Sequence, residues 1–258
     1  MKTAIRCAVL VALVTTAVVA ADPPYAGKWK MNPAKSDFGE MTVTYEQTPA
    51  GEIKVNADGQ SFTVKPDGKD YPTPWGTTSA WKSVDATTWS TTEKTNGKLM
   101  STGTVKLSAD GRTLRVDSKM MKVGGGSSDD SMVFQRVSDG SGLSGKWKAK
   151  KMNVGAPGIM EIAPTVSDGL TLKYVDQGGV CDAKFDGKDH PASGSMWPAG
   201  WTCMIAKSGA SGVELTWKKD GKLMYKTTLT ASADGKSLTE TGGAAATTEK
   251  IKVVYDRQ

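Results

Sequence analysis

Few residues of this 258-residue chain could carry out acid–base or nucleophilic chemistry. His190 is the only histidine, and the stretches GGGSS, SGSM and GASG lack the strand-turn-helix setting that a nucleophile or a phosphate site requires. The acidic residues are scattered through Asp-Gly turns rather than paired on strands, and turn formation explains five of them: Asp67, Asp110, Asp186, Asp220 and Asp234. The sequence therefore predicts no catalytic residues and a protein that is not an enzyme.

Aromatic side chains are better candidates for a binding site. Trp75 and Trp197 stand beside prolines in two predicted loops, and Tyr71 and His190 precede these loops at matching positions. Such side chains at the mouth of a β-barrel suit a concave apolar site with a few polar partners. The candidate ligand-binding residues are Tyr71, Trp75, Trp81, Trp89, His190, Trp197, Trp201 and Trp217. The alternative is that the indoles only fill the interior of the fold.

The N-terminal residues 1–21 read as a secretory signal peptide. Lys2 and Arg6 precede an apolar run, and small residues follow it at the expected cleavage point. No later stretch approaches the roughly 18 apolar residues of a membrane-spanning helix. We therefore expect a periplasmic or secreted protein with no transmembrane segment.

The charge pattern does not indicate a nucleic-acid partner. The formal net charge is +6, but the lysines mostly alternate with threonine, serine and apolar residues. A nucleic-acid-binding protein would cluster its basic residues on one element. The pattern instead indicates the solvated face of a sheet, with weak attraction to anionic envelope polymers as an alternative.

Cys181 and Cys203 are the two cysteines outside the predicted signal peptide. An even number in an exported protein favours a disulfide. The two residues fall on strands predicted to be adjacent, and their equivalents in the first half are Phe62 and Ser83. Two cysteines and one histidine are too few ligands for an ordinary metal site, so we predict no metal and no cofactor. A haem bound through His190 is the remote alternative.

The chain contains an internal repeat. GKWK, DGKD followed by Tyr-Pro or His-Pro, GKLM and SADG each occur twice in the same order, which indicates a tandem domain duplication. The two units span residues 27–137 and 145–257, and the Gly/Ser-rich residues 138–144 are predicted to link them.

Each unit has the pattern of short antiparallel strands. Apolar residues alternate with polar ones, as in Val43 and Tyr45 or Leu170 and Leu172, and Gly or Asp-Gly recurs about every eight to twelve residues. We predict an all-β fold of two small up-and-down antiparallel barrels with eight to ten strands each. Closure is favoured over a sandwich because consecutive strands are joined by hairpins, and a barrel leaves no exposed edge.

The ends of the units resemble a known superfamily. Each unit begins with Gly-x-Trp and ends with an arginine after an aromatic residue, which places six residues at barrel closure: Gly27, Trp29, Arg136, Gly145, Trp147 and Arg257. This pattern resembles the calycin superfamily, which includes the lipocalins, and GKWKMNPAKS resembles tandem lipocalin-like domains of uncharacterised exported bacterial proteins. The resemblance implies that Arg136 packs across Trp29 and that Arg257 packs across Trp147, each plugging one end of a barrel.

These observations lead to one functional hypothesis and one rival. The hypothesis is an exported, non-enzymatic protein that binds a small hydrophobic ligand in one or both barrels. The rival is a structural or interaction module of the cell envelope whose barrels are packed solid and bind no ligand.

Overall fold

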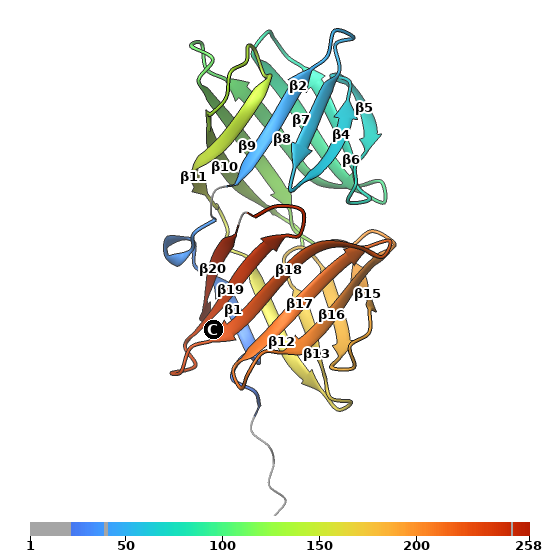
Figure 1. Cartoon of the computed structure of the whole chain (residues 1–258), viewed down its shortest axis with the longest axis vertical. Coiled ribbons are helices and arrows are strands. Elements are labelled where there is room, and N and C mark those ends of the chain that lie inside the picture. Colours follow the sequence, from blue (N-terminus) through green and yellow to red (C-terminus); the bar gives the residue numbers. More distant parts are fainter. Residues whose placement is uncertain (1–21, 39–40, 249) are drawn as a thin grey trace, which may run out of the picture.

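The computed structural model describes residues 22–38, 41–248 and 250–258, so the signal peptide predicted over residues 1–21 lies outside the described part. The described residues form twenty β-strands and one 3-10 helical turn, η1 (Pro33–Lys35). The strands make two antiparallel barrels of ten strands each, stacked end to end along the long axis (Figure 1). The predicted all-β fold is confirmed. Among the described residues, no helix has the length and apolar character needed to cross a membrane.

The first barrel, the upper one in Figure 1, is nearly closed. Its hydrogen-bonded order is β4-β3-β2-β11-β10-β9-β8-β7-β6-β5, so β4 and β5 form the two edges of the sheet. The strands are β2 (Thr42–Gln47), β3 (Ile53–Ala57), β4 (Gln60–Val64), β5 (Asp67–Pro72), β6 (Thr78–Ser83), β7 (Thr88–Thr95), β8 (Lys98–Leu107), β9 (Thr113–Met121), β10 (Ser127–Arg136) and β11 (Gly145–Asn153).

The second barrel is closed, in the order β1-β12-β13-β14-β15-β16-β17-β18-β19-β20. Its strands are β1 (Gly27–Met31), β12 (Ile159–Thr165), β13 (Gly169–Tyr174), β14 (Gly179–Lys184), β15 (His190–Gly194), β16 (Trp201–Lys207), β17 (Gly212–Lys219), β18 (Lys222–Ala231), β19 (Ser237–Ala244) and β20 (Ile251–Arg257).

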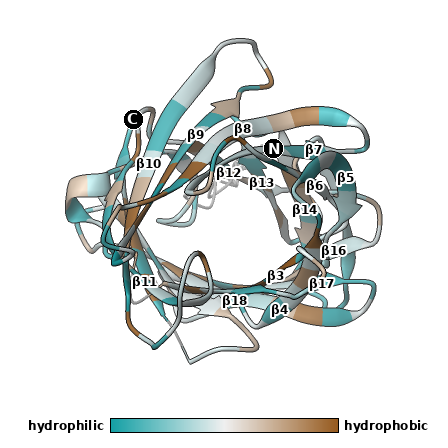
Figure 2. Cartoon of the chain, turned by 90° about the horizontal axis from the view of Figure 1, so that it is seen from above, coloured by the Kyte–Doolittle hydropathy of each residue, from teal (hydrophilic) through white to brown (hydrophobic). Residues whose placement is uncertain are grey.

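Tight turns and alternating side chains explain these strands. Asp58-Gly59, Asn96-Gly97 and Asp220-Gly221 each have positive φ at both residues, which is the geometry of the two-residue hairpin turn that matches strand twist. The predicted inward residues Val43 and Leu172 are buried in the two separate cores. Seen along the long axis, the strands of both barrels surround a common centre (Figure 2).

The first strand of each predicted unit lies in the other unit's barrel. β1 pairs with β12 and β20, and β11 pairs with β2 and β10. The first barrel is therefore one continuous segment, residues 42–153, whereas the second combines residues 27–31 with residues 159–257. The predicted units, 27–137 and 145–257, do not coincide with the barrels.

The repeat itself explains this exchange. Trp29 and Trp147 occupy the same position in equivalent GKWK strands, so either strand can close either barrel. β11 follows β10 after only residues 137–144, and a short loop closes at a small entropic cost. The strand β1 then fills the remaining place between β12 and β20.

The Gly/Ser-rich residues 138–144 do not link the barrels, contrary to the prediction. They lie in the loop of the β10–β11 hairpin, at the end of the first barrel that faces away from the second. The barrels are linked by residues 32–41 and by residues 154–158. Within the first link, Asn32 Nδ2 donates a hydrogen bond of 2.6 Å to Asp256, which fastens the link to the end of β20.

Candidate functional site

An arginine lies across a buried tryptophan at the outer end of each barrel. The guanidinium carbon of Arg257 is 4.2 Å from the ring centre of Trp29, and that of Arg136 is 4.3 Å from the ring centre of Trp147. Each indole N–H donates to the backbone carbonyl four residues earlier. The pairing expected within each unit, Trp29 with Arg136 and Trp147 with Arg257, is therefore wrong, because the first strands are exchanged.

The glycine of each Gly-x-Trp makes room for the arginine. A Cβ atom at Gly145 would lie 2.6 Å from Nη1 of Arg136, and one at Gly27 would overlap Arg257 in the same way. Both glycines also have a φ of +142°, which other residues rarely adopt. The Gly-x-Trp motif therefore requires glycine at its first position because the arginine lies against that residue at the outer end of each barrel.

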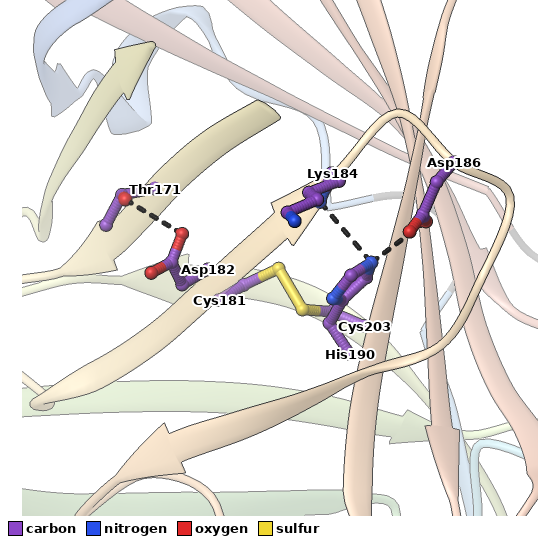
Figure 3. Close-up of a disulfide and its surroundings, with 7 residues drawn as sticks. All are labelled: Thr171, Cys181, Asp182, Lys184, Asp186, His190 and Cys203. Carbon is purple, nitrogen blue, oxygen red and sulfur yellow. Dashed lines mark hydrogen bonds and ion pairs between the residues drawn. A yellow bond between two sulfur atoms is a disulfide. The ribbon is translucent and has the colours of Figure 1, made fainter. Parts of the chain in front are cut away.

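Cys181 and Cys203 form the predicted disulfide (Figure 3). Both residues are buried, and their Cα atoms are 6.1 Å apart. The two cysteines were expected on adjacent strands, but they lie on β14 and β16, and β15 stands between these strands in the sheet order. β15 pairs with each neighbour over only two or three residues, so β14 and β16 also contact each other directly. Disulfides of this kind are typical of oxidising compartments.

His190 lies beside this disulfide (Figure 3). Its Nε2 atom is 2.9 Å from the Asp186 carboxylate, and this contact lowers the pKa of Asp186. The histidine therefore fastens the loop between β14 and β15. Among the described residues, no group of three or more His, Cys, Asp and Glu side chains is placed to hold a metal ion.

The two barrels meet through the loop that carries Trp75. The Trp75 indole N–H donates to the hydroxyl of Tyr225 at 2.8 Å, and the Trp201 indole N–H donates to the backbone carbonyl of Trp75 at 2.8 Å. Tyr225 in turn donates to Asp58 at 3.0 Å, and Lys222 donates to Gln60 at 2.7 Å. The residues of the first barrel are thus held against the inner end of the second.

An aromatic cavity of about 340 Å³ lies at this junction. Its aromatic walls come from both barrels: Trp75, Trp197, Trp201, Trp217 and Tyr225. Trp197 stacks on Trp217 with ring centres 4.4 Å apart, and it lies 5.0 Å from Trp201. The buried Trp197 Nε1 atom has no hydrogen-bond partner among the described residues. Four of the predicted ligand-binding residues are therefore brought together here.

Glu240 adds a carboxyl group to the wall of this cavity. It stands on β19, and its Oε2 atom accepts a hydrogen bond of 2.9 Å from the hydroxyl of Tyr255. Burial raises its pKa, although the hydroxyls of Tyr255 and Thr227 act in the opposite direction. The arrangement offers aromatic faces and one ionisable oxygen group to a small molecule.

The other predicted ligand-binding residues do not line this cavity: His190 lies on β15 of the second barrel, and the remaining three lie in the first barrel. Trp81 and Trp89 are buried in the core of that barrel, and Tyr71 packs against it while its hydroxyl donates to Asp67. Trp81 also packs edge-on against Tyr45, with ring centres 5.8 Å apart. These indoles match the alternative interpretation, in which they fill the interior.

The sequence interpretation missed Glu240, Thr227 and Tyr225. Strand alternation could have found Glu240, because it lies two residues after the buried Leu238 and so points to the same inner face. Tyr225 could not have been found in this way, since its role depends on the packing of the two barrels.

The first barrel has a half-buried carboxyl of its own. Glu93 on β7 accepts a hydrogen bond of 2.6 Å from Ser79, whose oxygen also accepts the Trp81 indole N–H at 3.1 Å. Burial, with a further contribution from Asp70, raises the pKa of Glu93 from its usual 4.5 to about 7. Folding therefore favours the protonated form.

This shift predicts a pH dependence of stability. As the pH rises from the unfolded pKa to the folded pKa, the fold must carry an increasingly ionised Glu93, so its free energy of unfolding falls. We expect the free energy of unfolding to fall by about 2 kcal/mol between about pH 4.5 and pH 7. This is less than the full pKa shift would give, because the side chain is only partly buried and solvent screens its charge. Glu93→Gln should remove this loss, measured as the difference between the two proteins in urea unfolding followed across that pH range. Parallel pH profiles of the two proteins would contradict it.

Comparison with known protein families and with curated protein sequences finds no match to this chain. The class that the fold defines is accordingly a protein of two ten-stranded antiparallel barrels joined at an aromatic cavity.

Proposed function

We propose that this protein binds a small, largely apolar molecule in the cavity between its barrels and performs no chemistry on it. The observation that carries the proposal is the cavity of about 340 Å³ lined by five aromatic side chains. This volume lies at the lower end of the range for small-molecule sites, which are mostly apolar with a few polar groups. The partnerless indole N–H of Trp197 and the Glu240 carboxyl would supply those polar groups.

We also propose that the protein is exported and is related to the lipocalin-like barrels. The disulfide between Cys181 and Cys203, together with the apolar residues predicted as a signal peptide, supports export. The arginine that lies over the Gly-x-Trp tryptophan at the outer end of each barrel supports the relationship to lipocalin-like barrels. The strand exchange departs from a simple tandem of such barrels.

Binding can be tested with the neutral fluorescent probe N-phenyl-1-naphthylamine, followed by displacement with fatty acids and retinoids. We expect saturable binding of one probe per chain, together with quenching of tryptophan emission. Thr227→Phe should abolish the binding, because the new ring fills the cavity that Thr227 lines.

The matched control is Thr228→Phe, whose side chain points to the opposite face of β18 and should leave binding unchanged. Melting curves of both variants would verify that they are folded. If no probe or ligand bound to the unmodified protein, and none were carried through purification in native mass spectra, the proposal would fail. That result would favour the rival, an interaction module without a ligand.

A further inference from the structure

The carboxyl of Glu240 is not required by the barrel fold. Aligning the two SADG turns places Glu240 opposite Val116 in the first half, where an apolar side chain occupies the equivalent position. A carboxyl group on the inner face costs stability when it ionises, unless a cation or several hydrogen bonds compensate. An ionised Glu240 beside the aromatic cavity would therefore need a cation or further hydrogen bonds to compensate its charge.

The described part of the protein does not supply a cation for Glu240. The groups that face it are the hydroxyl of Tyr255 on β20, the ring of Tyr174 on β13 and the hydroxyl of Thr227 on β18. Lys226 on β18 is exposed and pairs with Glu214 at 2.9 Å instead. None of the ion pairs in the described residues includes Glu240.

The aromatic rings provide the second half of a cation site. Indole faces attract ammonium groups more strongly than other aromatic side chains do, and the attraction is larger where water is excluded. Trp197, Trp201 and Trp217 form one packed group whose ring centres are 4.4 and 5.0 Å apart, and this group lines the same cavity as Glu240. An apolar ligand alone would make no use of the carboxyl group.

We propose that the cavity binds a small organic cation, an amine or a quaternary ammonium compound, with its charge against the tryptophan faces and the Glu240 carboxylate. This inference rests on the proposed ligand-binding function and names the chemical class of the ligand. The cation compensates the carboxylate, so binding converts the protonated Glu240 to its ionised form and releases the proton to solvent. Affinity for the cation therefore rises with pH until Glu240 is already ionised in the free protein.

The test compares choline with 3,3-dimethyl-1-butanol, which has the same shape but no charge, by isothermal titration calorimetry. We expect choline to bind at least about tenfold more tightly than the alcohol at about pH 8, where the carboxylate forms readily. Titrations in buffers with different ionisation enthalpies should reveal proton release on choline binding at about pH 5, and none on alcohol binding. Both measurements use the unmodified protein.

Two variants separate the carboxyl group from the rest of the cavity. Glu240→Gln should reduce the preference for choline to about twofold or less and abolish the proton release, while the alcohol still binds. Glu93→Gln removes a half-buried carboxyl that lies in the first barrel and does not line the cavity, and it should leave the preference intact.

The outcomes distinguish this inference from the function on which it rests. If the alcohol or the naphthylamine probe binds but choline has no advantage and releases no proton, the cation inference fails and the apolar-ligand function stands. If neither class of compound binds, both fail. Proton release together with a choline preference that depends on Glu240 would support both.

Discussion

Replacing Trp29 with alanine is expected to lower the free energy of unfolding of the second barrel by about 4 kcal/mol, the usual cost of removing a fully buried tryptophan. Trp29 is completely buried, stacks under Arg257, and lies between β12 and β20. The variant loses this packing and also leaves the guanidinium without its ring. Hydrogen-exchange mass spectrometry should therefore show faster exchange in β12 and β20.

The location of this loss tests the strand exchange. If the chain were a simple tandem, Trp29 would stabilise the first barrel, and exchange would rise in β2 and β10 instead. Trp147→Ala should give the opposite pattern, since β11 lies between those two strands. Lys28→Ala is a suitable control, because this exposed side chain makes only a surface ion pair with Glu161, at 3.4 Å.

Removing the disulfide is expected to have the next largest effect. The bond closes a loop of 22 residues, and the chain-entropy relation gives a stabilisation of about 3 kcal/mol for a loop of this length. Cys181→Ala/Cys203→Ala should lower the melting temperature of the second barrel by about 10 °C. Differential scanning calorimetry of the variant, and of the unmodified protein with and without reductant, provides the measurement.

The first barrel serves as the internal control for this experiment, because both cysteines belong to the second barrel. Its hydrogen exchange should not change in the double variant. An unchanged melting temperature after verified reduction would show that the loop is held in place by β14–β16 packing alone, and it would refute the prediction.

Much of the local structure could be predicted from the sequence. The alternation of Leu170 and Leu172 with polar neighbours identified an inner face, and Asp220-Gly221 identified a hairpin turn, because both signals depend only on neighbouring residues. The disulfide was also predictable, since Cys181 and Cys203 are the two cysteines outside the N-terminal segment. The position of β15 between the two cysteine-bearing strands was not predictable, because so short a strand has too few residues to show an alternating pattern.

The candidate site was only partly predictable. Trp75 and Trp197 were identified as mouth residues from their neighbouring prolines, and both line the cavity. His190 matched Tyr71 in the repeat, but it pairs with Asp186 and does not line the cavity. Equivalent positions of a repeat share a backbone location, whereas the role of a side chain depends on its own neighbours.

The sequence by itself determined that the chain contains two copies of one barrel pattern, each able to place a glycine, a tryptophan and an arginine at a closed end. Only the tertiary structure decided that Trp29 meets Arg257 and that Trp147 meets Arg136. The physical reason is that two strands beginning with the same GKWK satisfy the same local pattern in either barrel, so chain connectivity and loop closure choose between them. The cavity likewise exists only after Trp75 of one barrel packs against Trp201 of the other.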